Sequence, residues 1–209
     1  MKTCYIFAAA FRLPKSFKKR EEDLVIAADG GLAHLEKMKT IPDILLGDFD
    51  SLQSEPMAKE IIRLPVKKDD TDTLFAVKVG LERGFTRFVV YGGVGKRLDH
   101  TLANLQVLNF IAAKGGRGFL CGDDFTATAV MNSEISFSEN AKGTLSVFSA
   151  SGKADGVGLE GVLYPLTNAR ISCEFPIGVS NEFIGKTAKV SVTDGTLTVI
   201  WSGDEKVVI

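Results

Sequence analysis

Over residues 1–122, short apolar runs alternate with longer segments in which apolar residues recur at helical spacing. The runs are mostly uninterrupted, which is typical of strands that are buried on both faces. The predicted strands are Cys4–Ala9, Leu24–Ala28, Ile44–Leu46, Ile61–Leu64, Phe88–Tyr91 and Gly118–Cys121. The alternation of strands and helices predicts an α/β domain with a parallel sheet and helices on its faces.

Three helices are predicted between these strands, over residues 32–38, 71–83 and 99–114. Gly84 and Gly115 follow the second and third helices at the position where a glycine commonly ends a helix. The apolar face of the third helix is predicted to run through Leu98, Leu102, Leu105, Asn109 and Ala112.

From about residue 123 the pattern changes to short segments in which apolar and polar residues alternate, as in antiparallel strands with one buried face. The segments are Thr126–Met131, Glu134–Phe137, Thr144–Ser149, Val157–Leu163, Ala169–Cys173, Thr187–Val192 and Thr196–Trp201. Asp194-Gly195, between the last two segments, predicts a hairpin turn. We therefore expect an α/β domain over residues 1–122 and an all-β sandwich over residues 123–209.

Four loops rich in acidic residues or glycine follow predicted strands of the first domain. They are Asp29–Gly31, Gly47–Ser51, Asp69–Asp72 and Gly92–His100. If the strands are parallel, all four loops leave from the carboxyl edge of one sheet, where ligands of open α/β sheets bind. Two carboxylates about 4 Å apart repel each other by roughly 4 kcal/mol at an effective dielectric near ~20, so a cation is needed to offset them. Oxygen ligands and phosphates favour Mg²⁺, and the sequence predicts a metal-dependent enzyme acting on a phosphorylated substrate.

The loop Gly47–Ser51 gives the sharpest signal of the four. Asp48 and Asp50 are two residues apart, so their carboxylates share one face of an extended segment and can share a cation. Ser51 can donate a hydrogen bond to a phosphate oxygen. The structural alternative is an acidic turn that caps the next segment.

The segment Asp69–Asp72 opens a predicted helix, and Asp and Thr are common at helix starts for capping alone. Three carboxylates with Thr71, preceded by Lys67-Lys68, exceed what a cap requires. We expect a functional role for at least one carboxylate, with Asp69 and Asp72 favoured.

The loop Gly92–His100 differs from the Walker phosphate loop, because Val90 stands where that motif needs glycine and Arg97 follows the lysine. Its glycines still let backbone N–H groups face a phosphate, and the Arg97 guanidinium can bind two phosphate oxygens at once. Asp99 is either a ligand or the cap of the following helix. For Asp29-Gly30-Gly31, a ligand site and a simple turn with a cap are equally supported.

Composition narrows the class of protein. The formal net charge is −1, with 45% hydrophobic and 24% charged residues, which argues against a nucleic-acid or membrane partner held by bulk charge. Cys4, Cys121 and Cys173 are an odd number without metal-like spacing, and we expect reduced core thiols in a cytoplasmic protein. The apolar start, residues 1–11, is short, and the basic stretch Lys15–Arg20 follows it. A signal peptide has its basic residues before the apolar run, so a buried strand is favoured here.

In combination, these motifs resemble those of the thiamin pyrophosphokinase family. The matching elements are AADGG at 27–31, PDILLGDFDS at 42–51, KDDTDTLFA at 68–76, GKRLDHTLAN at 95–104, YPL at 164–166 and SNEF at 180–183. They follow one another through both predicted domains, and the combination is specific although each piece is weak. One departure is Lys96, which stands where the family commonly has a second glycine.

The resemblance implies Mg²⁺-dependent transfer of a diphosphoryl group from ATP, the co-substrate, to the hydroxyethyl oxygen of thiamin, with release of AMP. It also implies a homodimer, with thiamin bound where the β domain of one subunit meets the α/β domain of the other. The metal count and the group that accepts the alcohol proton stay open.

The resemblance also assigns roles to individual residues. Asp48, Asp50 and Asp72 are expected to hold Mg²⁺, with Asp69 and Asp99 supporting the metal, the ribose or the phosphates. The remaining nucleotide contacts are expected from Asp29, Gly30, Ser51, Lys68, Thr71 and Arg97. Thiamin is expected to contact Tyr164, Ser180 and Asn181 by stacking and hydrogen bonds.

Two other functions fit the acidic loops. One is a Mg²⁺-dependent phosphotransferase with a different acceptor alcohol. Only the segment Ser180–Phe183 favours thiamin over such an acceptor. The other is a module that binds a nucleotide without turning it over, although a pure binder gains little from so many carboxylates.

Overall fold

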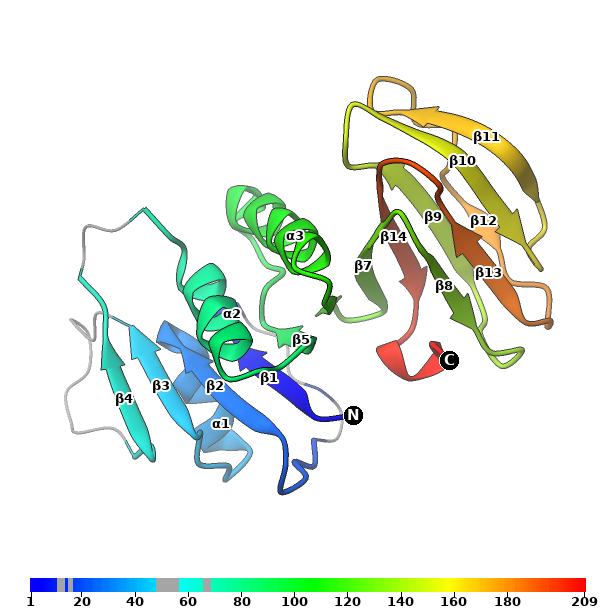
Figure 1. Ribbon diagram of the computed structural model, residues 1–209. Helices are drawn as coiled ribbons and strands as arrows, with labels where there is room; N and C mark the ends of the chain where they lie inside the picture. Colours follow the sequence, from blue (N-terminus) through cyan, green and yellow to red (C-terminus); the bar gives the residue numbers. More distant parts are fainter. Residues whose placement is uncertain (11–13, 15–16, 48–56, 66–68) are drawn as a thin grey trace. The chain divides into compact units, whose positions relative to one another are not determined.

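The apolar runs near the start of the chain form the parallel strands that their pattern predicts. The structure is a computed structural model that describes residues 1–10, 14, 17–47, 57–65 and 69–209. The chain divides into two units (Figure 1). The first unit comprises Met1–Val107 and Gly115–Gly122, and the second comprises Leu108–Lys114 and Asp123–Ile209.

The described strands of the first unit form a parallel sheet in the order β6-β5-β1-β2-β3-β4. They are β1 (Thr3–Phe7), β2 (Leu24–Ala28), β3 (Ile44–Gly47), β4 (Glu60–Arg63), β5 (Arg87–Tyr91) and β6 (Arg117–Cys121). The α/β class with a parallel sheet is thus confirmed. The strands in the middle are almost entirely buried, whereas β4 at the edge is mostly exposed.

Helices cover both faces of this sheet. Successive residues of a strand point to opposite faces. On one face, Phe7 of β1 packs in a cluster with Leu32 and Leu35 of α1 (Leu32–Lys37). On the other face, Cys4 of β1 lies beside Gly80 of α2 (Asp72–Glu82), where a Cβ would come within 3.1 Å of the Cys4 sulfur. The two predicted helices therefore lie on opposite sides of the sheet.

The third helix, α3 (Leu98–Ala113), forms as predicted but buries a different face. Leu98 and Leu102 are 69% and 54% exposed. The buried residues are Asn104, Val107, Leu108 and Ile111. The predicted buried face is therefore wrong. The spacing of leucines identifies residues that share one face of the helix, but it does not show which face packs against the rest of the protein.

The second unit contains two antiparallel sheets that form a β-sandwich, as expected. One sheet has the order β12-β9-β14-β7, from β7 (Phe125–Met131), β9 (Thr144–Ser149), β12 (Asn181–Glu182) and β14 (Thr196–Ser202). The other has the order β11-β10-β13-β8, from β8 (Glu134–Phe137), β10 (Lys153–Glu160), β11 (Leu166–Ser172) and β13 (Ala188–Ser191). Phe137 of β8 and Trp201 of β14 meet edge to face, with ring centroids 5.1 Å apart, so they join the two sheets in one core.

The predicted hairpin at Asp194-Gly195 is wrong. The strands on either side, β13 and β14, belong to different sheets, so the turn crosses between the layers of the sandwich (Figure 1). Gly195 does adopt the positive φ, +111°, that the dipeptide suggested. Two backbone hydrogen bonds join Asp194 to Asp155 of β10. The Asp155 N–H donates a 2.8 Å bond to the Asp194 carbonyl, and the Asp194 N–H donates a 3.1 Å bond to the Asp155 carbonyl. Turn chemistry thus predicted the bend but not the partner strand.

The cysteines follow the expectation in part. Cys4 and Cys121 are buried free thiols, and burial raises the pKa of the Cys4 thiol well above its ordinary range. Cys173 is also free but exposed, so the expectation of a core position is wrong for it. No helix in the described part of the chain is long and apolar enough to span a membrane.

Candidate active site

The candidate site lies at the carboxyl edge of the parallel sheet. Asp29 follows β2 directly, Gly92 follows β5, and residues 8–10 continue from β1. Asp48, Asp50 and Ser51 come immediately after β3, which ends at Gly47, but these three residues and Lys68 lie outside the described residues. Because the strands are parallel, every one of these connections leaves the sheet at the same edge.

Glycines let two of the loops press against the extension of β1. A Cβ on Gly31 would lie 1.8 Å from the Phe7 carbonyl oxygen, and a Cβ on Gly92 would lie 2.3 Å from that of Ala8. Gly92 also has a φ of +67°, and its carbonyl accepts a 2.9 Å hydrogen bond from the Ala10 N–H. The loops after β2 and β5 therefore lie on either side of the same short segment, at backbone contact.

Asp29 adopts an uncommon backbone conformation within this group. Its φ is +48°, and a residue with a side chain adopts such a value at some cost in free energy. Its side chain is exposed, and the next residue, Gly30, lies against Ala9. Asp adopts a positive φ in ordinary turns as well as at ligand sites, so the turn and the ligand interpretations of this loop both stay open.

At the start of α2, two residues of the acidic segment, Thr71 and Asp70, make contacts that stabilise the helix. Thr71 is the N-cap, and its hydroxyl accepts a 3.2 Å hydrogen bond from the Leu74 N–H. Asp70, which precedes the N-cap, forms a 2.5 Å ion pair with Lys78 of α2. Asp69 is exposed, and Asp72 is the first helical residue. The capping alternative thus accounts for Thr71, and Asp69 and Asp72 stay the candidates for chemistry.

At the start of α3, Arg97 just before the helix and Asp99 in its first turn bind each other. Two hydrogen bonds of 2.6 and 3.3 Å join the guanidinium to the carboxylate, and both side chains are exposed. This hydrogen bonding holds the pKa of Asp99 below its ordinary value. A phosphate bound at Arg97 would compete with Asp99 for the guanidinium.

Asn104 is a residue of this region to which the sequence had assigned no role. It is buried in α3, and its side-chain N–H donates a 2.7 Å hydrogen bond to the Gly93 carbonyl. The signal was present in the sequence, because Asn104 stands among the apolar residues Val107, Leu108 and Ile111 at helical spacing. The buried position of Asn104 was missed because the buried face was predicted to run through Leu98.

In the second unit, the three residues expected to bind thiamin lie close together in two neighbouring segments. The Asn181 amide is 5% exposed, accepts a 2.9 Å hydrogen bond from the Tyr164 N–H and donates a 2.7 Å bond to the Tyr164 carbonyl. The Tyr164 side chain itself is 65% exposed. Ser180 has a φ of +61°, another strained value for a residue with a side chain.

Exposed apolar side chains gather in the same stretches of sequence. They are Leu163, Phe175, Ile177, Val179 and Ile184, each between 43% and 64% exposed. No role was predicted for these side chains from the sequence, and Leu163 ended a predicted strand. Clustered apolar exposure of this kind marks ligand or protein contact surfaces.

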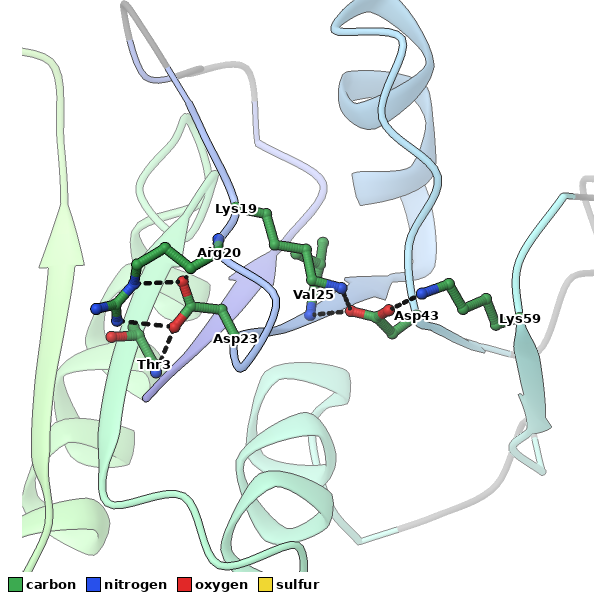
Figure 2. Close-up of polar contacts among 7 residues, drawn as sticks. All are labelled: Thr3, Lys19, Arg20, Asp23, Val25, Asp43 and Lys59. Atoms are coloured by element: carbon green, nitrogen blue, oxygen red, sulfur yellow. Dashed lines mark hydrogen bonds and ion pairs between the residues drawn. The ribbon is translucent and has the colours of Figure 1, made fainter. Parts of the chain in front are cut away.

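Two other carboxylates, Asp23 and Asp43, lie at the opposite edge of the parallel sheet (Figure 2). Asp23 immediately precedes β2 and accepts a 2.8 Å hydrogen bond from the Thr3 N–H at the start of β1. Asp43 immediately precedes β3 and accepts a 2.8 Å bond from the Val25 N–H at the start of β2. Each carboxylate thus binds the first part of the neighbouring strand, and this pattern is structural.

Basic side chains complete these two contacts. Asp23 pairs with Arg20 at 3.0 Å, and Asp43 pairs with Lys59 at 2.9 Å and with Lys19. Burial by itself raises the pKa of both carboxyls, but the hydrogen bonds outweigh it and hold the pKa of each below its ordinary value. At the amino edge, these two groups of ion pairs and hydrogen bonds, called the clamps below, hold neighbouring strands together. The candidate site lies at the carboxyl edge.

The described residues alone do not form a metal centre. Within the described ranges, no group of three or more His, Cys, Asp or Glu side chains lies close enough together to hold a metal ion. Of the three carboxylates expected to hold Mg²⁺, only Asp72 lies in those ranges. Its donor chemistry fits a hard divalent cation, and so does that of Asp48 and Asp50.

Comparison with known proteins relates both units to one family. Residues 17–117 match the family model of the thiamin pyrophosphokinase catalytic domain, and residues 132–197 match that of the thiamin pyrophosphokinase vitamin B1 binding domain. The chain is 29% identical over 193 residues to the thiamine pyrophosphokinase of Bacillus subtilis, which covers 88% of this chain and 89% of the relative.

Solved structures agree with this relationship. The crystal structure of thiamine pyrophosphokinase from Bacillus subtilis superposes with a TM-score of 0.84 at 26% identity, over 97% of this chain and 99% of the other. That of a thiamin pyrophosphokinase family protein from Enterococcus faecalis gives 0.81 at 27% identity, over 98% and 100%. The chain therefore belongs to the thiamin pyrophosphokinase family, enzymes that form thiamin diphosphate by transfer of a pyrophosphoryl group.

Proposed function

We propose that this enzyme transfers the terminal diphosphoryl group of ATP to the hydroxyethyl oxygen of thiamin in a Mg²⁺-dependent reaction that releases AMP. The observation that carries the proposal is the match of the two family models, in order, to the two parts of the chain. The loops packed at the carboxyl edge of the sheet support it, because that edge is where such folds bind nucleotides.

In the proposed reaction, the thiamin hydroxyl oxygen attacks the β-phosphorus of ATP, the bond from that phosphorus to the α-phosphate oxygen breaks, and AMP leaves. The alcohol proton passes to a carboxylate of the site or to solvent. Transfers of this kind depend mainly on alignment and on stabilisation of charge, with little covalent work for the protein. The enzyme's task is therefore to hold two substrates in line.

The acidic residues are assigned to the metal. Asp48, Asp50 and Asp72 would hold Mg²⁺, which when bound neutralises charge on the transferred group. Asp69 and Asp99 would support the metal shell, the ribose or the phosphates. The position of Asp72 at the start of α2 and the end of β3 at Gly47 support this assignment.

The nucleotide is assigned to the neighbouring loops. Asp29 and Gly30 come from the strained turn after β2, and Ser51, Lys68 and Thr71 come from the flanks of the acidic segments. Arg97 would leave its contact with Asp99 and bind phosphate oxygens. The close packing of the loops after β2 and β5 on residues 7–10 supports a rigid phosphate-binding surface.

Thiamin is assigned to the second unit. Tyr164 would stack on an aromatic ring of thiamin, Ser180 would hydrogen-bond it, and Asn181 would belong to the same site. The exposed apolar side chains near these residues also support a homodimer. The free thiols of Cys4 and Cys121 agree with a cytoplasmic protein.

The test is to incubate the enzyme with ATP, Mg²⁺ and thiamin and to measure AMP and thiamin diphosphate by chromatography. We expect both products in equal amounts with Mg²⁺ and neither with excess EDTA. A panel of other alcohols serves as the comparison. AMP formation with another alcohol but not with thiamin would indicate a different acceptor, and nucleotide binding without AMP would indicate a binding module.

A further inference from the structure

Asn104 is a polar residue on the apolar side of α3. Its buried neighbours along the helix are Val107, Leu108 and Ile111. Burying a side-chain amide is unfavourable unless its hydrogen bonds are replaced. The bond from Asn104 to the Gly93 carbonyl, 2.7 Å long and buried, makes that replacement. The position is therefore explained by its contact with Gly93 and not by packing.

The Gly93 backbone is confined on the side that faces the sheet. A Cβ at this residue would lie 2.6 Å from Leu120 of β6 and 3.1 Å from both Val90 of β5 and the Asn104 nitrogen. Gly92, the preceding residue, is also held in place, because its carbonyl accepts a hydrogen bond from the Ala10 N–H. The loop has little freedom to translate, and the orientation of its peptide groups is what a hydrogen bond can still determine.

Asn104 determines the orientation of one of these peptide groups. The described residues contain no cis peptide bond, so the C=O of Gly93 and the N–H of Val94 point in opposite directions across a planar unit. Because Asn104 draws the carbonyl toward α3, the N–H of Val94 is turned away from the helix. Backbone N–H groups of this kind bind phosphate oxygens when a loop presents them together.

We infer that Asn104 is a positioning residue for the phosphates of the nucleotide: it holds the Gly93 carbonyl and so aims the following N–H at the ligand. The inference rests on the proposed function, in which the loop Gly92–Gly95 faces ATP. Asn104 touches no substrate in this account and acts through Gly93 alone.

The test is the variant Asn104→Asp, which keeps the size of the side chain and replaces the N–H donor by an oxygen that repels the Gly93 carbonyl. Binding of a non-hydrolysable ATP analogue is measured by calorimetry with Mg²⁺ at pH 8, for this variant and for Asn104→Ala, which has no side-chain donor in any protonation state. We expect binding about tenfold weaker and KM for ATP raised about tenfold. KM for thiamin should change less than KM for ATP, because Asn104 contacts the loop that is assigned to the nucleotide.

Asn181→Asp is the matched comparison, since Asn181 is the second buried asparagine whose amide bonds the carbonyl of a loop residue. It should raise KM for thiamin and leave binding of the ATP analogue unchanged. This crossed pattern separates positioning from general loss of stability, which would affect both substrates alike.

A folded Asn104→Asp enzyme that binds the ATP analogue within about twofold of the unchanged enzyme would overturn the inference. If this variant does not fold, the same measurement on Asn104→Ala decides by the same criterion. The unchanged enzyme is assayed for AMP in parallel. Absence of AMP there refutes the proposed function, whereas normal AMP formation with no effect of the Asn104 variants refutes only the role of Asn104.

Discussion

The side-chain amide of Asn181 binds both backbone polar groups of Tyr164, 17 residues away in the sequence. The amide takes the place that a neighbouring strand would occupy and fixes the backbone of a residue whose ring is mostly exposed. The same oxygen accepts a 2.9 Å bond from the Glu182 N–H. Asn181 therefore ties β12 to the segment that carries Tyr164.

The first prediction concerns this tie. Asn181→Ala removes it and leaves part-buried backbone groups of Tyr164 without the Asn181 amide, so we expect KM for thiamin to rise about tenfold and the free energy of unfolding to fall by about 1–3 kcal/mol. Steady-state kinetics and urea denaturation measure the two effects. Asn140→Ala, at an exposed turn of the same unit, should change neither. Unchanged thiamin kinetics in a folded Asn181→Ala enzyme would contradict the assignment.

The second prediction concerns the ring of Tyr164. Tyr164→Phe keeps the aromatic face and should leave KM for thiamin within about threefold, whereas Tyr164→Ala removes it and should raise KM about tenfold. Because the side chain is exposed, neither change should affect stability appreciably. Equal kinetics for the two variants would show that Tyr164 does not stack on thiamin.

The third prediction concerns the acidic residues. Asp50→Ala and Asp72→Ala each remove a proposed metal ligand, so kcat should fall by about a hundredfold or more while the far-UV circular dichroism stays unchanged. Asp70→Ala is the matched control, because that carboxylate is paired with Lys78 and has no proposed role in chemistry. It should retain activity within about threefold. Near-normal turnover of both Asp50→Ala and Asp72→Ala would rule out the proposed metal ligands.

The fourth prediction concerns pH and stability. The folded-state pKa values of Asp23 and Asp43 lie below their ordinary values, so both carboxylates stabilise the fold above the unfolded pKa of about 4. That stability is lost as pH falls through the lower folded pKa. The double variant Asp23→Asn, Asp43→Asn should be less stable at pH 7 by about 2–5 kcal/mol and should show a flatter loss of stability below about pH 4.

Urea denaturation at a series of pH values measures this effect. The variant Asp124→Asn, at an exposed carboxylate of the second unit, serves as the control and should follow the unchanged enzyme. A double variant with the same stability at pH 7 and the same dependence on pH would show that the clamps at the amino edge contribute nothing.

The strands of the first unit were predictable because buried parallel strands require uninterrupted apolar runs, and Leu24–Ala28 and Phe88–Tyr91 are such runs. The helix over residues 71–83 was predictable because Thr71 caps it and Gly84, with a φ of +75°, ends it. These signals are local, and local signals can be recognised in a single sequence.

Other features depend on contacts between distant residues. The turn at Gly195 was placed correctly, but whether the next strand pairs with the last one or crosses to the other sheet depends on the core around Trp201. Likewise, Asn181 was chosen as a thiamin ligand for its motif, and its bonds to Tyr164 became visible only when the two segments were brought together. The structure does not describe Asp48, so that part of the predicted site stays a prediction.

The central claim is that a diphosphoryl group, and not a single phosphoryl group, moves from ATP to thiamin. The most direct measurement uses ATP carrying a radioactive label in the α-, β- or γ-phosphate and separates the products by chromatography. We predict that β- and γ-labels both enter the thiamin product in equal amounts and that the α-label stays in AMP. Entry of the γ-label alone, with ADP as the other product, would contradict the account.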